Sequence, residues 1–310
     1  MSQQLNPGTI YVQEYASGKP GTLHSLDLET GRVTTIGSIA AEVYDLEFVD
    51  QNLYGLKKKE FGFRKTMKLL RIDPVSGKSE DVGDTQFDVV GLAYNPVDKK
   101  LYATAHRNRQ IVELDLTTGR GSPVVTLRDR NRQCGELAFS SEGVAYITLI
   151  GSDLRKYLAT CDLTTGNINL IGDTGFPGLA SMKFIDHTLY GVAGQYERVG
   201  GNNGEFIRID TTTGKGTLVT TTTPPVCWAG LAIGAPVVAP PEISVDWEAP
   251  SPQPPTVSIP TPIDTPSAPD SKKGNITKEQ IMDLLTIDTK KNCYVIDTGA
   301  MNDLQQNVAS

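Results

Sequence analysis

The chain has 310 residues, of which 38% are hydrophobic and 21% are charged, and its formal net charge is -7. The hydrophobic fraction excludes wholesale disorder, and no window approaches the roughly 20 consecutive apolar residues of a membrane-spanning helix. The mild acidity disfavours a general nucleic-acid binder. The N-terminus MSQQLNPGTI lacks the basic and apolar regions of a Sec signal peptide, so we expect cytoplasmic synthesis.

A nine-residue phrase recurs five times in the first 214 residues. The copies are LHSLDLETG, LLRIDPVSG, IVELDLTTG, LATCDLTTG and FIRIDTTTG, at residues 23–31, 69–77, 111–119, 158–166 and 206–214. Each copy follows an aromatic-containing phrase such as NLYGL and precedes a short apolar run and a phrase such as GLAYN. Short runs of β-branched, aromatic and aliphatic residues between turn residues are typical of strands. The pattern predicts five copies of a four-strand unit.

The end of the recurring phrase predicts a hairpin turn. Its aspartate can accept backbone N–H bonds within the turn, and its glycine can adopt the positive φ that precedes the next strand. The five aspartates, Asp27, Asp73, Asp115, Asp162 and Asp210, are 46, 42, 47 and 48 residues apart. Because the aspartate recurs in every unit, we interpret it as part of the scaffold.

The LYG and ID-x-x-TG repeats resemble those of bacterial β-propellers of the YVTN and NHL type. The resemblance covers residues 8–235 and implies an all-β, five-bladed propeller whose innermost strand comes first in each blade. On that order, residues 9–37 supply the second to fourth strands of one blade, and WAGLAIG (228–234) supplies its innermost strand. We therefore predict that pairing of the two ends of the body closes the ring without an open sheet edge.

Positive charge gathers in the turns between the second and third strands and in one loop between blades. Their lengths and sequences vary while the strands hold constant, as expected of binding surfaces on a scaffold. The candidate binding residues are Arg64, Arg107, Arg109, Arg128, Arg130 and Arg132. Guanidinium groups suit carboxylates and phosphates, so the expected partner is an anionic glycan or an acidic protein. The simpler interpretation is a solvated set of charged loops.

The innermost strands predict a second candidate site, on the axis. Aligning them on their central Leu or Met places Asp45, Glu136 and Ser181 in one column and Glu47 and Lys183 in another. Because side chains alternate along a strand, both columns lie on the same side. Some five-bladed propellers are glycoside hydrolases with axial acids, and an inverting pair would be about 6.5–9.5 Å apart. The simpler alternatives are a bound cation, a water cluster or a salt bridge to Lys183.

The sequence carries no signature of a cofactor or metal centre. The three histidines are scattered, and no Cys-x-x-Cys, nucleotide-binding glycine loop or nucleophile elbow is present. We therefore predict no cofactor and no metal, and buried free thiols at Cys134, Cys161 and Cys227.

Proline separates the repeats from the end of the chain. Eleven of the 19 prolines lie in residues 236–269, so we predict an extended, semi-rigid linker over 236–273. The final segment, 274–310, predicts an amphipathic helix followed by a strand at 292–297. It is too small for a dependable core, so its apolar residues are expected to dock onto a protein partner. They are Ile281, Leu284, Leu285, Tyr294, Val295 and Ile296.

Three functions follow from these features. The first is a non-enzymatic binding or structural propeller, tethered by residues 274–310 to a larger assembly such as a virion or a secretion apparatus. The second is a lectin-like propeller, although its pockets would need near-identical residues in equivalent loops, and these loops differ. The third is a glycoside hydrolase that uses Asp45 and Glu136.

Overall fold

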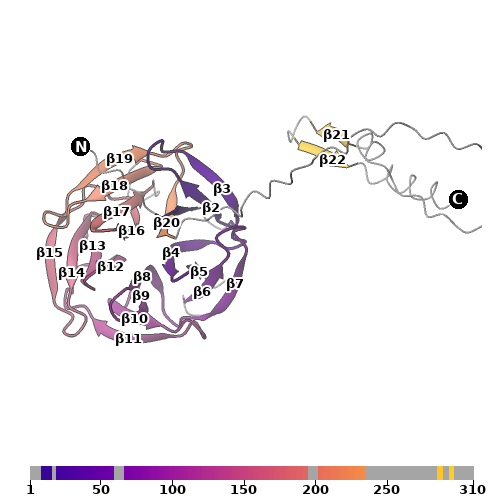
Figure 1. The fold of residues 1–310 in the computed structure, drawn as a ribbon. Helices are drawn as coiled ribbons and strands as arrows, with labels where there is room; N and C mark the ends of the chain where they lie inside the picture. The colour runs from indigo at the N-terminus through magenta and orange to yellow at the C-terminus, as the bar shows by residue number, and fades with distance from the viewer. Residues whose placement is uncertain are drawn as a thin grey trace, which may run out of the picture. The chain divides into compact units, whose positions relative to one another are not determined.

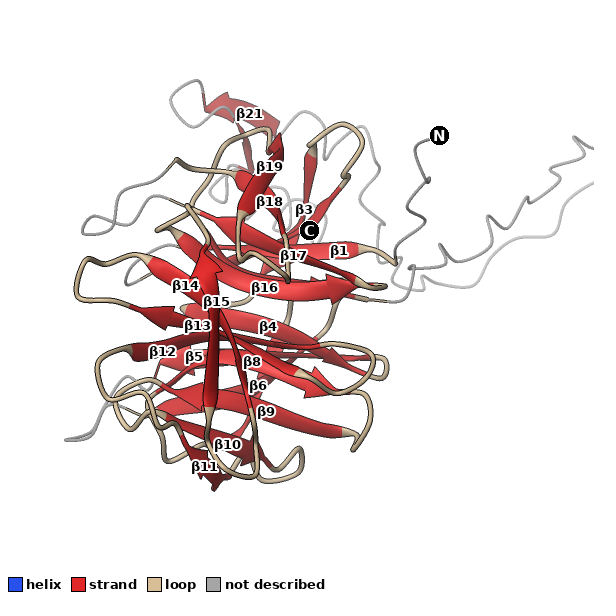
Figure 2. Cartoon of the chain, turned by 90° about the vertical axis from the view of Figure 1, so that its left-hand side faces the viewer, coloured by secondary structure: helices blue, strands red, loops and turns tan. Residues whose placement is uncertain are grey.

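The computed structural model describes residues 8–15, 19–58, 66–194 and 202–234, and the backbone of two further strands near the C-terminus. Figure 1 shows five sheets around a central axis, and Figure 2 shows that ring from the side. Each sheet has four antiparallel strands. The predicted five-bladed β-propeller is confirmed.

The blades follow the repeats along the chain. Blade 1 contains β20 (Trp228–Ile233), β1 (Ile10–Glu14), β2 (Thr22–Leu26) and β3 (Val33–Ser38), ordered from the axis outwards. Blade 2 contains β4 (Val43–Val49), β5 (Asn52–Lys58), β6 (Met67–Ile72) and β7 (Ser79–Asp84). Blade 3 contains β8 (Val89–Asn95), β9 (Lys100–Ala105), β10 (Gln110–Leu114) and β11 (Gly121–Thr126). Blade 4 contains β12 (Gln133–Phe139), β13 (Ala145–Ile150), β14 (Lys156–Cys161) and β15 (Ile168–Asp173). Blade 5 contains β16 (Leu179–Ile185), β17 (Thr188–Ala193), β18 (Glu205–Ile209) and β19 (Gly216–Thr221).

Blade 1 is assembled from both ends of the propeller sequence. Strand β1 pairs with β2 on one side and with β20 on the other, and Val12 lies opposite Leu231 in the second pairing. The pairing supplies β1 with a partner along the edge that faces the axis. The closure predicted from residues 228–234 is therefore confirmed.

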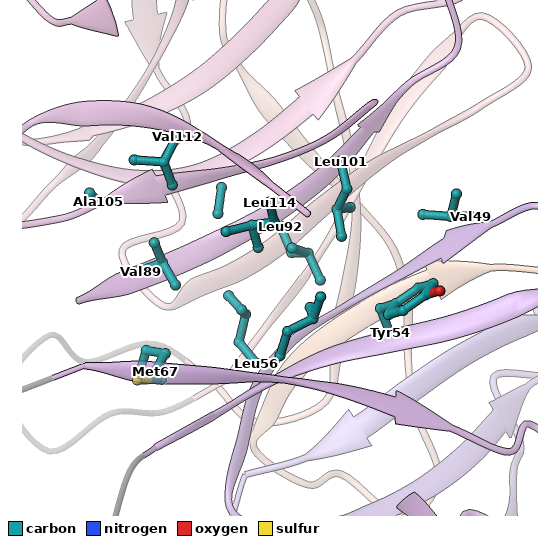
Figure 3. Close-up of a cluster of buried hydrophobic side chains, with 12 residues drawn as sticks. Val49, Tyr54, Leu56, Met67, Val89, Leu92, Leu101, Ala105, Val112 and Leu114 are labelled. Carbon is teal, nitrogen blue, oxygen red and sulfur yellow. The ribbon is translucent and has the colours of Figure 1, made fainter. Parts of the chain in front are cut away.

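The core fills the gaps between neighbouring blades. One apolar residue at the centre of each inner strand is fully buried, namely Leu46, Leu92, Leu137, Met182 and Leu231. Between blades 2 and 3, Leu56 and Leu69 pack with Leu92, Leu101 and Val112 (Figure 3). Burial of one such side chain contributes about 1.5–3 kcal/mol. Because each gap is lined by two different blades, a blade cannot bury its own faces alone.

Aromatic side chains cross three of these gaps. Tyr11 packs on Phe48 with ring centroids 5.2 Å apart. The pairs Tyr102–Phe139 and Tyr146–Phe184 repeat the arrangement at 5.3 Å. In each pair the tyrosine comes from a second strand and the phenylalanine from the inner strand of the next blade, so the aromatic phrases of the repeat hold consecutive blades together.

The hairpin turns have the predicted chemistry. Oδ1 of Asp115 accepts the backbone N–H groups of Thr117 and Thr118 at 2.9 and 2.7 Å, and Gly119 has a φ of 72°. The hydrogen bond from the Thr118 backbone is the main reason that the pKa of Asp115 lies below its usual range. The equivalent aspartates accept backbone N–H bonds in the other four blades. These aspartates are scaffold residues.

Glycine permits a second contact between blades at the circumference. A Cβ placed on Gly83 would lie 1.9 Å from the carbonyl oxygen of Thr118, and one on Gly172 would lie 2.1 Å from that of Thr213. Thr118 and Thr213 belong to the hairpin turns of the following blades. A larger residue would push the turn away, because a backbone carbonyl cannot swing aside as a long side chain can.

A separate compact unit covers Ser244–Ser310, and the first covers Met1–Ile243. In the second unit, β21 (Leu285–Asp288) pairs antiparallel with β22 (Cys293–Ile296). Strand β22 agrees with the strand predicted at 292–297. Leu285 was predicted in a helix, but it begins β21; pairing with β22 outweighs the helical spacing of the apolar residues. Ile281, Leu284 and the predicted linker lie outside the described residues.

We predict that Gly172→Ala lowers the free energy of unfolding by about 1–3 kcal/mol, because the new methyl group collides with the turn of blade 5. Val125 occupies the equivalent position in β11, since it pairs with Ile111 as Gly172 pairs with Leu158. Val125→Thr is the matched control, with an expected change within about 0.5 kcal/mol. Urea denaturation measures both variants, and equal losses of stability would contradict the close approach at Gly172.

Candidate functional site

Asp45 lies at the centre of the axial cluster and is completely buried. Its Oδ1 accepts hydrogen bonds from the Ser181 hydroxyl at 2.6 Å and the Leu46 N–H at 2.8 Å. Its Oδ2 accepts the Leu92 N–H at 2.7 Å and lies 3.3 Å from Nζ of Lys183. The carboxyl group therefore connects blades 2, 3 and 5.

Glu47 continues this arrangement one step along the same side of β4. Its Oε2 accepts the Tyr94 N–H at 3.2 Å and lies 3.8 Å from Nζ of Lys183. The ammonium group of Lys183 also donates to the carbonyl oxygen of Leu92 at 2.7 Å. Strand β8 is the innermost strand of its sheet, and no strand of the described residues pairs with its axial edge. Asp45, Glu47 and Lys183 supply the hydrogen bonds that a neighbouring strand would otherwise provide.

Glu136 forms a second pair in the same region. Its Oε1 lies 3.1 Å from Nζ of Lys156, and the side chains are 9% and 11% exposed. Lys156 also donates to the carbonyl oxygen of Leu179 in blade 5. Glu136 and Asp45 thus have different cationic partners, although each pair connects blade 5 to another blade.

Burial dominates the protonation of these carboxyl groups. It raises the pKa of Glu47 and of Glu136 to about 7, against the opposing effects of Lys183 and Lys156 respectively. Burial also raises the pKa of Asp45, opposed by Lys183 and by its hydrogen-bond donors. A carboxyl group with a raised pKa can serve as a general acid only where a substrate can reach it. Asp45 is fully buried and its two oxygens accept hydrogen bonds within the ring.

The structure brings five of the six predicted arginines to one end of the ring. Gln110 in β10 lies opposite Thr126 in β11, so the turn with Arg107 and Arg109 lies beside the loop 127–132. Nη1 of Arg109 donates to the carbonyl oxygen of Arg130 at 2.9 Å. Arg64 lies outside the described residues.

These arginines differ in whether their guanidinium groups contact other residues of the propeller. Arg132 pairs with Asp129 at 2.8 Å and lies over the ring of Tyr157, and Arg128 donates to the carbonyl oxygen of Thr165. Arg107 pairs with Asp88 at 3.0 Å, but its side chain remains 68% exposed. Arg130 is exposed, and its guanidinium has no partner among the described residues. Arg107 and Arg130 are therefore the two most available to a partner.

The described part of the chain has neither a cluster of metal-binding side chains nor a membrane-spanning helix. No group of three or more His, Cys, Asp or Glu side chains there could hold a metal ion. The same part contains no helix that is long and apolar enough to cross a membrane. Cys134 and Cys161 are buried free thiols, as predicted. Cys227 was predicted to be buried as well, but it is only half-buried, because it lies just before the start of β20.

Sequence reasoning missed two features. Lys156 was not recognised as the partner of Glu136, because the pair depends on how β12 and β14 are placed within one sheet. An aromatic residue also follows the central Leu or Met by two positions in four inner strands: Phe48, Tyr94, Phe139 and Phe184. Alignment of the repeats displays this column, which could have been found from the sequence.

Comparison with known proteins supports the fold alone. No protein-family description matches the chain, and no curated protein matches it. A chain from the crystal structure of a nidogen–laminin complex is similar, with a TM-score of 0.50 and 12% identity over 73% of this chain and 98% of that one. A protein of unknown function from Bacteroides thetaiotaomicron VPI-5482 has a TM-score of 0.44 at 12% identity, over 70% of this chain and 60% of that one. The chain is a β-propeller repeat protein.

We predict that Lys183→Met destabilises the ring by about 3–5 kcal/mol at pH 8, because it leaves Asp45 and Glu47 buried without their cation. The loss should be smaller at pH 5.5. Removing Lys183 raises the pKa of both carboxyl groups further, and protonation below those pKa values removes the unpaired charge. Lys100→Met is the control, because its pair with Glu113 is exposed. Chemical denaturation at both pH values measures the effect, and a loss independent of pH would contradict it.

Proposed function

We propose that this protein is a non-enzymatic binding propeller that recognises an anionic partner and is attached to a larger protein assembly by residues 274–310. The observation that carries the proposal is the exposure of Arg107 and Arg130 on turns that differ from blade to blade. Fold does not dictate function, so the argument rests on these residues.

The binding surface combines a fixed scaffold with unrepeated turns. Arg109 donates to the backbone of Arg130, and Arg128 donates to the turn of blade 4, so the loop 127–132 is held at both sides. A held loop loses less conformational entropy when a partner binds. The exposed guanidinium groups of Arg107 and Arg130 offer paired donors that match carboxylate, sulfate or phosphate oxygens.

The axial carboxylates support a structural rather than a hydrolytic role in this proposal. A glycosidase would need Asp45 and Glu136 to contact a sugar and water. Asp45 instead accepts the Leu92 N–H and the Ser181 hydroxyl, and Glu136 pairs with Lys156. We further propose that the repeats are of the YVTN or NHL type.

The tether is the second part of the proposal. The chain after residue 243 forms a unit of its own, and its apolar residues exceed those of a solvating tail. A virion or a secretion apparatus is the kind of assembly that a propeller on a proline-rich linker would serve, because the linker separates a binding ring from its anchor.

We predict that the double variant Arg107→Glu/Arg130→Glu elutes from a heparin column at lower NaCl than the wild type, because it exchanges attraction for repulsion at the exposed turns. The double variant Arg32→Glu/Arg120→Glu is the matched control, because it changes the net charge by the same amount. Both residues are exposed arginines that directly follow the glycine of a hairpin turn, at the ends of β2 and β10 that lie away from the turns between the second and third strands. If the control elutes earlier to the same extent, retention depends on total charge, and the proposal that Arg107 and Arg130 form a binding surface is contradicted.

We predict that deletion of residues 274–310 leaves the unfolding transition of the propeller unchanged but removes the proteins that co-purify with the full-length chain. The ring contains all five blades before residue 235, so the deletion takes away none of its strands. Quantitative affinity purification of both forms measures the difference. Retention of the same partners by the shortened chain would contradict the tether.

A further inference from the structure

A pocket of about 270 Å³ lies on the axis of the ring. It is at the end opposite the turn that carries Arg107 and the loop 127–132, which together are called the arginine turns. All five inner strands contribute to its wall through the position two residues after their central Leu or Met. These residues are Phe48, Tyr94, Phe139, Phe184 and Ile233. The pocket is near the lower limit of the range for small-molecule sites, roughly 300–1,000 Å³, so it suits a small ligand.

The polar side chains of the pocket are two carboxylates, one ammonium group and two hydroxyl groups, from Glu47, Asp186, Lys183, Tyr94 and Ser141. Glu47 and Lys183 both line it, and the ammonium group of Lys183 already contacts Asp45, Glu47 and the Leu92 carbonyl oxygen. It donates hydrogen bonds to Asp45 and to the Leu92 carbonyl oxygen, and it forms an ion pair with Glu47 at 3.8 Å. The Glu47 carboxylate accepts two backbone N–H bonds and retains further acceptor capacity. Asp186 adds an exposed carboxylate to the lining.

The charges at this end of the axis do not balance. Asp45, Glu47 and Asp186 supply three carboxyl groups, and Lys183 supplies one ammonium group. Four aromatic rings line the same space, and the face of an aromatic ring attracts cations. An anion would be repelled by the carboxylates of Glu47 and Asp186. We propose that the pocket binds a small organic cation, with its charged head near Glu47 and its apolar groups against the aromatic rings.

The proposal implies that affinity depends on pH. Burial raises the pKa of Glu47 to about 7, while Lys183 from β16 and the Tyr94 N–H from β8 oppose the shift and Asp45 on its own strand adds to it. Burial raises the pKa of the Tyr94 hydroxyl, so that group stays neutral near pH 7. Below pH 7 Glu47 gains a proton and loses its charge. Affinity for a cation should therefore fall between pH 8 and pH 6.

The test compares choline with 3,3-dimethylbutan-1-ol, which has the same shape without the charge. Calorimetric titration of the full chain at pH 8 should show saturable binding of choline to one site and at least tenfold weaker binding of the neutral alcohol. Tyr94→Leu should weaken choline binding about fivefold, as expected from the loss of roughly 1 kcal/mol of cation–π attraction. Tyr157→Leu is the matched control, because Tyr157 is a half-buried tyrosine beside the arginine turns.

A second variant guards against an effect of Tyr94→Leu on folding. Asp186→Asn changes an exposed residue and should weaken choline binding twofold or more without moving the thermal transition. Equal binding of choline and the alcohol would reduce the site to an apolar pocket and overturn the proposal. Absence of choline binding, or the same affinity at pH 6 and pH 8, would also overturn it. None of these results bears on the heparin measurement, which concerns the other end of the ring.

Discussion

The propeller depends on the antiparallel pairing between β1 and β20. The faces of every blade are buried only by the blades on either side, so an open row would leave two apolar faces in water. Pairing of Val12 with Leu231 joins the first and last segments of the ring into one sheet. A second seam closes the circumference, where the backbone of Thr223 exchanges hydrogen bonds with Gly31 and Val33. Residues about 190 to 220 positions apart in the chain therefore hold the ring closed.

Closure creates a problem at the axis that side chains solve. Five inner strands converge there, and each has an edge with N–H and C=O groups and no neighbouring strand. Glycine at Gly91 and Gly230 lets adjacent inner strands approach, since a Cβ on Gly91 would lie 2.9 Å from Cα of Glu136. Where the edge of β8 faces the axis, Asp45, Glu47 and Lys183 provide its hydrogen bonds. Buried charges are tolerated here because each has partners on more than one blade.

This use of the axis makes the two ends of the ring chemically different. The repeated residues are the same in kind from blade to blade and form the scaffold: the turn aspartates, their glycines and the inner leucines. Two groups of residues that differ between blades carry charge that is not repeated. One is the arginine-bearing turns, where loops vary freely, and the other is the carboxylate and lysine cluster behind the aromatic pocket. The arginine proposal rests on these departures from the five-fold repeat, and the cation proposal combines one of them with the aromatic residues that recur in four inner strands.

The sequence by itself determined the architecture, because each repeat contains the strand and turn residues that specify one four-stranded blade. Turn chemistry, strand alternation and spacing recur five times, and the order of the phrases implied that residues 228–234 complete the first blade. The roles of the axial residues were decided only by the tertiary structure. Alignment placed Asp45 and Glu136 in one column, but it could not show that Asp45 contacts Lys183 and Ser181 across the axis while Glu136 pairs with Lys156. Those pairings depend on how side chains from non-adjacent strands meet. The prediction of a helix at Leu285 was wrong for a related reason. Strand β21 is stabilised by pairing with β22, and the local sequence pattern around Leu285 carries no information about that pairing.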